Sequence, residues 1–279
     1  MDTQPLTKDI LCSHFDDLLG AGQAEQRRVL FEAALGAGDL LMAHFRQPQQ
    51  VKQKEGKDFT TAVDGQAETL IKGIIGRDFP DHSIMGEEQG LSGQAEYQWV
   101  VDPIDGTFNY TFGLAHFAVS IALVRDGRTL LGAVYDPAYR ELFFAQRGQG
   151  AWLDLTPIHV SDRRALGDAL VGLDLTYEVS MALKDVARLT AVIPAARAVR
   201  LLGSAALELA AVACGRLDVF FHSALSPWDW AAGGLLVEEA GGRITDPDGI
   251  DLPGPRLATQ SLVATNGYLH EAIRRLPGF

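Results

Sequence analysis

Two aspartates, Asp102 and Asp105, lie three positions apart after the apolar run Trp99–Val101. We expect a strand to end at Asp102 and Pro103 to turn the chain. Both carboxylates and the Ile104 carbonyl between them can then point toward one place. Because Mg²⁺ prefers oxygen ligands of these kinds, the segment predicts a metal site. An ordinary surface turn explains the same residues, because Asp-Pro and Asp-Gly are common turn dipeptides.

The next two residues, Gly106 and Thr107, suit a phosphate group. They offer backbone N–H groups in a tight turn, and such groups bind anions. The sequence thus places a predicted phosphate site beside the predicted metal site.

Further acidic residues each have a second explanation. Glu87 and Glu88 follow the apolar approach Ser83–Gly86, but such a pair is commonly a solvated charge pair. Asp229 is the third residue of a helix expected to start at Ser226-Pro227, where it can serve as part of a capping box. The metal hypothesis therefore depends on the acidic segments taken together.

Asp58 and Asp64 frame Thr60 and Thr61 at the start of another expected helix. Stabilisation by the helix dipole explains acidic residues at this position without a metal. This segment, too, carries weight only in combination with the others.

The spacing of apolar residues predicts helices over Glu25–Phe45 and Ala62–Phe79. Runs rich in Val, Ile and aromatic residues predict strands over Tyr97–Val101, Phe117–Val124, Leu130–Tyr135 and Leu142–Ala145. In the second half we expect strands over Leu170–Leu173, Leu217–His222, Arg243–Thr245 and Leu262–Thr265. The helices expected there are Met181–Ile193, Ser204–Cys214 and Trp228–Ala240.

This mixture indicates an α+β fold of stacked sheet and helix layers rather than a regular βαβ winding. We expect one domain over residues 1–279, with two lobes over about 25–155 and 156–279. Residues 1–24 are expected to form a loose or helical extension with no clear partner.

The composition limits the functions that we expect. A formal charge of −12 over 279 residues argues against binding to nucleic acid or to an anionic membrane. The longest apolar stretches fall short of the ~20 residues that span a bilayer, and the start of the chain does not resemble a signal peptide. Cys12 and Cys214 lie far apart and in no metal-ligand pattern. We therefore expect a cytoplasmic protein.

Taken in order, four segments resemble the motifs of the inositol monophosphatase family. They are Asp58-Phe-Thr-Thr-Ala-Val-Asp64, Gly86-Glu87-Glu88, Asp102-Pro-Ile-Asp-Gly-Thr-Phe-Asn109 followed by Phe117–Leu123, and Trp228-Asp229-Trp-Ala-Ala-Gly233 followed by Glu239–Asp246. The resemblance runs from about Glu25 to the C-terminus. It implies a layered αβαβα sandwich of the inositol monophosphatase and fructose-1,6-bisphosphatase type, and hydrolysis of a small phosphorylated metabolite.

The family pattern implies a role for each matching residue. The implied metal ligands are Glu87, Asp102, Asp105, Asp229 and the Ile104 carbonyl. Asp64 and Thr107 would hold the attacking water, and Gly106 and Thr107 would cradle the phosphate. The implied substrate residues are Gly203, Ser204 and Ala205 for the organic half, and Lys54 near the phosphate, with Lys52 or Lys57 as alternatives.

The resemblance also implies two or three Mg²⁺ ions, inhibition by Li⁺ and a homodimer. Two metals about 3.5–4 Å apart can bind the attacking and the leaving oxygen of an in-line displacement. Packed carboxylates without cations would repel one another, which agrees with a metal requirement. No Ser-His-acid triad or cysteine nucleophile is needed.

One position departs from the family pattern. Inositol-type members present a glutamate seven residues before the motif aspartate, and this chain has His222 there. A satisfied surface or core histidine is the plain alternative to a substrate contact. A ring facing the pocket would donate and accept hydrogen bonds and could carry positive charge near pH 6.5, which would favour a second anionic group on the substrate.

Other functions within and beyond this fold stay open. Fructose bisphosphate, histidinol phosphate and nucleotide bisphosphate are alternative substrates, although Phe108-Asn109-Tyr110 is typical of the inositol-phosphate branch. A regulatory binding protein that retains the site is the alternative from a different class, because some bacterial members bind transcription machinery. The preferred interpretation is a Mg²⁺-dependent phosphatase.

Overall fold

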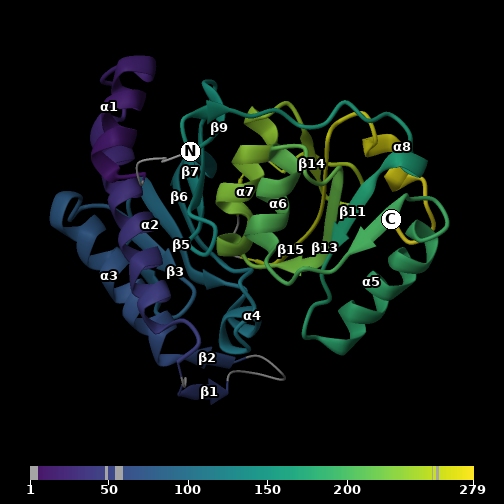
Figure 1. The fold of residues 1–279 in the computed structure, drawn as a ribbon, viewed down its shortest axis with the longest axis horizontal. Helices are drawn as coiled ribbons and strands as arrows, with labels where there is room; N and C mark the ends of the chain where they lie inside the picture. Colours follow the sequence, from purple (N-terminus) through teal and green to yellow (C-terminus); the bar gives the residue numbers. More distant parts are fainter. Residues whose placement is uncertain (1–5, 48–49, 54–58, 253, 256–257) are drawn as a thin grey trace.

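The computed structural model describes residues 6–47, 50–53, 59–252, 254–255 and 258–279. Two large sheets alternate with three layers of helices (Figure 1). The helices are α1 (Lys8–Leu19), α2 (Ala24–His44), α3 (Ala62–Asp78), α4 (Thr107–Thr111), α5 (Val179–Val192), α6 (Ala205–Ala213), α7 (Pro227–Glu239) and α8 (His270–Arg274).

The first sheet has eight strands in the order β10-β9-β8-β7-β6-β5-β3-β4. They are β3 (Ser83–Gly86), β4 (Gly90–Ser92), β5 (Tyr97–Asp105), β6 (Ala118–Arg125), β7 (Arg128–Asp136), β8 (Glu141–Gln146), β9 (Gly150–Leu153) and β10 (Thr156–Pro157). The pairing is antiparallel except between β3 and β5. Strand β6 is apolar and buried along nearly its whole length, as expected of a strand covered by helices on both faces.

The second sheet has five strands in the order β12-β11-β13-β15-β14. They are β11 (Leu170–Leu173), β12 (Ala198–Arg200), β13 (Val219–Leu225), β14 (Arg243–Thr245) and β15 (Gln260–Thr265). Strand β11 pairs in parallel with both of its neighbours, whereas β15 is antiparallel to both of its own. A separate short ladder joins β1 (Val51–Gln53) to β2 (Phe59–Thr61).

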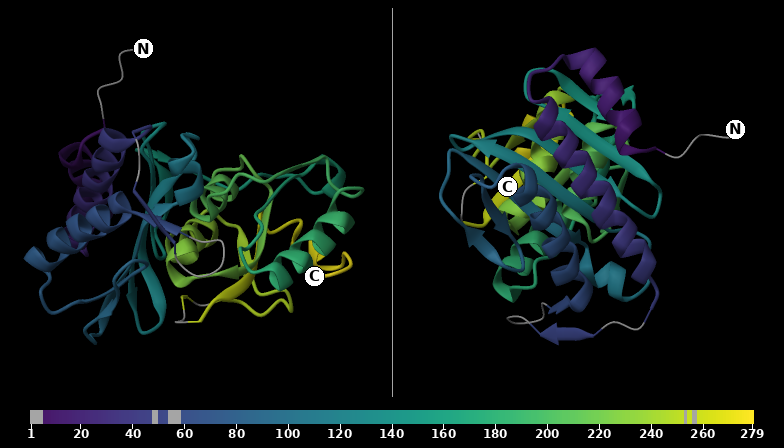
Figure 2. Two further views of the ribbon diagram at one scale, coloured as in Figure 1. Left: turned by 90° about the horizontal axis from the view of Figure 1, so that it is seen from below. Right: turned by 90° about the vertical axis from the view of Figure 1, so that its left-hand side faces the viewer.

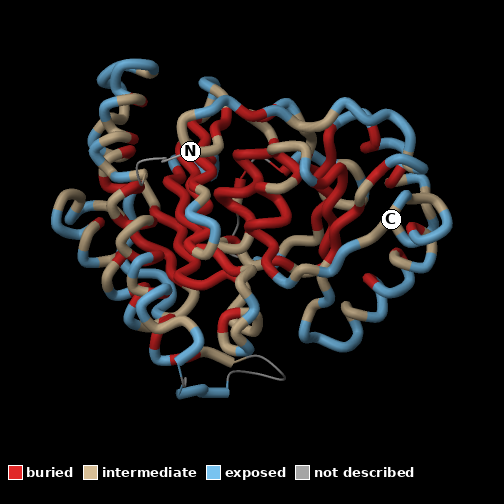
Figure 3. Tube along the Cα trace, in the orientation of Figure 1, coloured by how far each residue is buried: buried red, intermediate tan, exposed pale blue. Residues whose placement is uncertain are grey.

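The three helix layers and the two sheets together make five layers, which Figure 2 shows from two further sides. Helices α2 and α3 cover the outer face of the first sheet, α6 and α7 lie between the two sheets, and α5 and α8 cover the second. Buried residues follow the sheets and the middle helices (Figure 3). The expected α+β sandwich is confirmed.

Helix α1 packs on the hydrophobic core that lies between α2, α3 and the first sheet. This corrects the expectation that the N-terminal segment has no clear partner. The Phe15 ring lies 4.8 Å from Phe144 and 5.2 Å from Trp152, measured between ring centroids. Arg27 of α2 is fully buried and donates to the Asp16 carboxylate at 2.6 Å. The aromatic contacts of Phe15 that hold α1 are long-range in sequence, which is why spacing alone does not reveal them.

Most expected elements are present, with ends shifted by a few residues. Strand β11 and strand β14 agree in both bounds with the expected ranges. The short elements β1, β2, β4, β10, β12 and α4 were not expected, because two to five residues carry too little periodicity. Both cysteines are free. In the part of the chain that the structure describes, no helix combines the length and the apolar character that crossing a membrane requires.

Candidate active site

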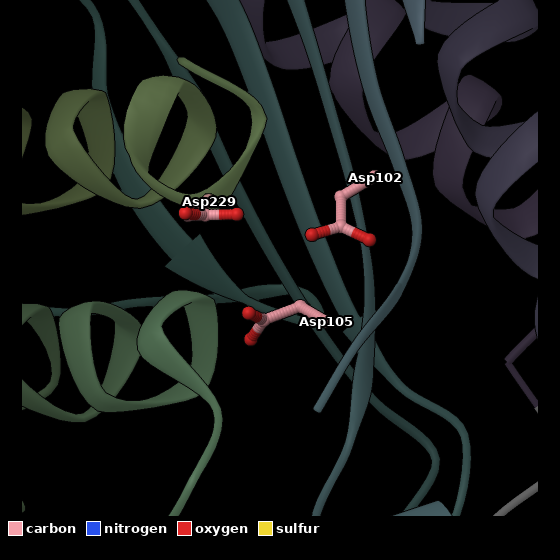
Figure 4. Close-up of side chains that lie close together, drawn as sticks. All are labelled: Asp102, Asp105 and Asp229. Carbon is pink, nitrogen blue, oxygen red and sulfur yellow. The ribbon is translucent and has the colours of Figure 1, made fainter. Parts of the chain in front are cut away.

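Three carboxylates from two distant segments converge between the first sheet and α7. Asp102 and Asp105 lie on β5, and Asp229 lies in the first turn of α7 (Figure 4). Each offers one oxygen, and these oxygens all lie within 4.8 Å of one another. Such hard oxygen donors match the coordination chemistry of Mg²⁺, so the residues present fit the implied metal.

Strand β5 continues through the two aspartates, so the expected strand end at Asp102 is wrong. The pairing with β6 is regular up to Asp102 and Ser120, is irregular over the next two residues and resumes at Asp105 and Ala118. Within this irregularity the Ile104 N–H donates to Asp102 Oδ1 at 3.0 Å. The one extra residue on β5 places both aspartates on one side of the strand, as a β-bulge does.

Asp105 is also held by the start of α6. The Ser204 hydroxyl donates to Asp105 Oδ2, and the Ala206 N–H donates to the same oxygen at 2.9 Å. Ser204 is the N-cap of α6, so the positive end of this helix faces the carboxylate. These contacts join the first sheet to the middle helix layer at the site.

Asp229 caps its helix and belongs to the acidic group at the same time. Its Oδ2 accepts the Ser226 N–H at 2.7 Å, which completes the capping box expected from the sequence. The two explanations offered for Asp229 are therefore compatible. In each of the three aspartates a backbone N–H fixes one oxygen, and this restricts how the carboxylate can rotate.

Glu87 lies beside Asp102, in the turn between β3 and β4. The two carboxyl groups share a hydrogen bond, and the Glu87 N–H donates to Val101 O at 3.2 Å. The turn itself is held by Glu68, a fully buried residue of α3. Glu68 accepts the Glu88 N–H at 2.7 Å and the Gln89 N–H at 3.0 Å.

Sequence reasoning missed Glu68, although it lies four residues after Asp64 and therefore on the same face of α3. A methyl group added at Gly86 would come within 2.2 Å of Glu68 Oε1, so the turn and the helix are in close contact. Lys72 approaches the same oxygen at 2.9 Å. The four-residue spacing from Asp64 is the sequence feature that could have pointed to Glu68.

The acidic residues are buried, and burial has electrostatic consequences. Burial, and then the neighbouring Glu87, raises the pKa of Asp102 well above its usual range. Burial raises the pKa of Asp105 to about 7, although Ser204 and Ala206 oppose the shift. The cluster therefore favours added positive charge, which protons or a divalent cation can supply.

Asp64 and Thr107 are in direct contact beside the cluster. The Thr107 hydroxyl lies 3.1 Å from Asp64 Oδ1 and 3.0 Å from the Ile104 carbonyl oxygen. The other oxygen of Asp64 accepts the Thr61 N–H at 2.9 Å, because Asp64 is the third residue of α3 and forms a capping box. Burial raises the pKa of Asp64.

The segment after Asp105 packs against the start of α6. Gly106 has φ +94°, and a side chain there would lie 3.0 Å from the Gly203 carbonyl oxygen. The Asn109 amide donates to Leu202 O at 2.7 Å and to His116 O at 2.8 Å. The structure thus places the segment from Gly106 to Asn109 against Leu202 and Gly203, just before α6. The roles of Gly106, Thr107, Gly203 and Ser204 toward a substrate stay predictions.

A second acidic pair, absent from the sequence prediction, lies on the α6 side. Asp174 follows β11 and accepts the Gly203 N–H at 2.8 Å. Glu208 of α6 is fully buried, and burial and then the neighbouring Asp174 raise its pKa well above the usual range. No motif pointed to this pair, because its members lie in segments without metal-ligand spacing.

His222, an expected substrate residue, is buried on β13. Burial, with a contribution from Arg188, lowers the pKa of His222 to about 4, so the ring is neutral and the expected positive charge near pH 6.5 is wrong. Its Nδ1 accepts the Ala224 N–H at 3.0 Å. Lys54 and its alternative Lys57 lie outside the described residues, and Lys52 lies exposed on β1.

Removal of the carboxylate of Glu68 should weaken metal binding. We expect Glu68→Ala to lower Mg²⁺ affinity about 10- to 100-fold, the usual effect of a residue that orients a ligand. Glu68→Gln, which keeps an acceptor oxygen, should lose less. Calorimetric titration of Mg²⁺ would measure both. Glu25→Ala, which removes an exposed carboxylate of α2, is the control, and an equal loss there would contradict the role of the turn.

The metal-free protein should become less stable as the pH rises. Since the folded pKa of Asp105 is about 7 and its ordinary value is 3.8, the folded state holds more protons between these values. The free energy of unfolding therefore falls as pH rises through that window. Denaturant titrations in EDTA should show a smaller fall for Asp105→Asn, and greater stability than wild type at pH 8. Parallel profiles for the two proteins would contradict this.

The chain is similar over most of its length to known proteins. The model of the inositol monophosphatase family matches residues 23–276. A Xylella fastidiosa protein named Nus factor SuhB is 41% identical over 87% of this chain and 96% of its own length. A Thermotoga maritima fructose-1,6-bisphosphatase/inositol-1-monophosphatase is 38% identical over 85% of this chain and 89% of its own.

Solved structures agree with the sequence comparisons. The extragenic suppressor protein suhB from Bartonella henselae superposes with a TM-score of 0.83 and 33% identity, covering 88% of this chain and 96% of its own. An IMPase from Thermotoga maritima gives a TM-score of 0.80 and 34% identity, covering 88% and 93%. With the fold, the acidic group and the family match in agreement, the chain belongs to the inositol monophosphatase family.

Proposed function

We propose that the protein is a Mg²⁺-dependent phosphomonoesterase that hydrolyses a small phosphorylated metabolite of the inositol monophosphate type. The observation that carries the proposal is the convergence of Asp102, Asp105 and Asp229 next to the Asp64–Thr107 contact. An acidic group alone is compatible with a structural metal site that has no catalytic role. An acidic group beside a buried carboxylate–hydroxyl pair also provides a place for an attacking water.

In the proposed mechanism the ligands would be Glu87, Asp102, Asp105, Asp229 and the Ile104 carbonyl. When bound, Mg²⁺ supplies positive charge to the phosphate and lowers the pKa of water. The Thr107 hydroxyl, held between Asp64 and the Ile104 carbonyl, orients the attacking water by a hydrogen bond. Asp64 accepts the proton through Thr107, and its raised pKa suits a general base working near neutral pH.

The phosphate is proposed to lie against the backbone of Gly106 and Thr107. The positive φ of Gly106 turns the chain sharply after Asp105, which leaves backbone N–H groups available near the acidic group. The organic half of the substrate would then lie toward the start of α6, near Gly203, Ser204 and Ala205. Lys54 stays a prediction for the phosphate side.

The substrate within this class is open to test. The names of the relatives include an inositol monophosphatase from tomato and the bifunctional name of the Thermotoga protein. Because His222 is neutral and replaces the expected glutamate, we propose weaker selectivity for inositol phosphates than in members with the glutamate. The neutral ring removes the reason to expect preference for a second anionic group.

A second candidate function is regulatory binding that retains the site. The observation in its favour is that several relatives carry the name Nus factor SuhB, among them the Escherichia coli protein at 39% identity. These names argue against the expectation of no involvement with nucleic acid. A homodimer, a cytoplasmic location, inhibition by Li⁺ and the division into two lobes stay predictions.

Phosphate release should depend on Mg²⁺. We expect inorganic phosphate from inositol 1-phosphate and from sugar phosphates with Mg²⁺, and none in EDTA, because the buried carboxylates need a cation to accept a phosphate dianion. A panel of phosphomonoesters assayed for phosphate would measure this. Asp105→Asn is the matched inactive variant; full activity in it would contradict the metal site, and inactivity of wild type on all esters would favour regulatory binding.

Loss of the Thr107 hydroxyl should slow turnover without loss of metal. We expect Thr107→Ala to lower kcat by about 10²- to 10⁴-fold, the range for a positioned acid–base group, with Mg²⁺ affinity little changed. Steady-state kinetics and Mg²⁺ titration would measure the two effects. Thr107→Ser keeps the hydroxyl and should recover most of the rate. A parallel loss of metal affinity would show that Thr107 has a structural role instead.

A further inference from the structure

Four aromatic side chains form a cluster that the proposed mechanism does not use. Phe108 of α4 is its centre: the ring centroid lies 4.2 Å from Phe59 of β2, 5.0 Å from Tyr177 and 6.5 Å from Phe112. Tyr177 lies just before α5, so the cluster joins segments from both halves of the chain. We call these four residues the aromatic cluster.

Three residues of the aromatic cluster lie close in sequence to residues of the candidate active site. Phe108 directly follows Thr107. Phe59 lies two residues before Thr61, whose N–H binds Asp64. On the other side, Tyr177 lies three residues after Asp174, and Asp174 accepts the N–H of Gly203. Each of these three rings therefore lies within three residues of a residue that forms or contacts the proposed site.

The aromatic cluster exposes much of its apolar surface. Phe112 is 74% exposed and Tyr177 is 48% exposed. The same segment also carries Tyr110, which is buried against Phe117 and Phe45 and serves ordinary packing. Exposed contiguous apolar side chains cost free energy in water, and where they occur beside a polar site they commonly mark ligand binding.

We propose that the aromatic cluster is the part of the substrate site that binds an aromatic ring on the alcohol of a phosphomonoester. This inference rests on the proposed phosphatase function. A polyol needs hydrogen-bonding partners for each hydroxyl, and ring carbons offer none. An aromatic ring on the substrate, by contrast, can stack on or meet the edge of Phe108 and Tyr177 and covers apolar surface that is otherwise exposed.

The rings come from both halves of the chain. Phe108 lies on α4 and Tyr177 lies between β11 and α5, and the centroids of the two rings are 5.0 Å apart. A ligand bound there contacts both halves of the molecule. Among phosphomonoesters, the aromatic cluster would therefore favour those whose alcohol carries an aromatic ring a short distance from the ester oxygen.

The test compares 2-phenylethyl phosphate with ethyl phosphate, since both leave as simple alkoxides and differ in the ring. We expect wild-type kcat/KM to be about 3- to 10-fold higher for the phenylethyl ester, mostly through KM, as one aromatic contact provides. Phe108→Ala and Tyr177→Ala should each bring the ratio close to one. Phe108→Tyr keeps the ring and should keep the ratio.

If a substitution next to Thr107 lowers kcat/KM for both esters alike, this general loss cancels in the ratio of the two kcat/KM values. Tyr139→Ala is the matched control, because Tyr139 is an aromatic residue that is 70% exposed and lies outside the aromatic cluster; its ratio should equal that of wild type. Equal kcat/KM for both esters in wild type, or a ratio unchanged in Phe108→Ala and Tyr177→Ala, would overturn the inference. Hydrolysis of neither ester with Mg²⁺, nor of any other phosphomonoester, would instead overturn the proposed function.

Discussion

The confinement of several carboxylates in a region that excludes most water is the constraint on which the site depends. Asp102 is 2% exposed and Asp105 is 7% exposed, and close negative charges repel strongly where the local dielectric constant is low. Backbone N–H groups fix one oxygen of each aspartate and offset part of this repulsion. The repulsion that remains raises the pKa values of the aspartates, and the same repulsion favours the binding of a cation.

The two middle helices are arranged around this constraint. Helices α6 and α7 both begin at the acidic group, so the positive ends of two helix dipoles face it. Close packing brings α7 to the sheet: a methyl group at Gly132 of β7 would lie 2.9 Å from the Cα of Ala232. The glycine allows α7 to approach the sheet in which β5 carries the other two aspartates. Fold and site are thus determined by the same contacts.

The sequence was sufficient for the layers and for the acidic residues, because both leave local patterns. Apolar periodicity predicted α2 and α3. The spacing of Asp102 and Asp105 predicted that their carboxylates point to one place, whereas Asp229 was added to them by the family resemblance. The turn held by Glu68, the partner of α1 and the Asp174–Glu208 pair were missed, because they depend on contacts between distant segments. Charge was misjudged at His222 for the same reason, since burial is a property of the folded chain.

Helix α3 carries two buried carboxylates on one face, each with a proposed role in the site. Asp64 contacts Thr107, and one turn later Glu68 holds the segment that presents Glu87. Because both residues lie on one helix, a shift of α3 would displace both carboxylates. Substitutions in its packing against α2 or β5 would therefore affect the proposed water-binding residue and the turn that carries the proposed ligand Glu87 together. Substitutions that accumulate in α3 would therefore change the proposed water binding and the proposed cation binding together rather than separately.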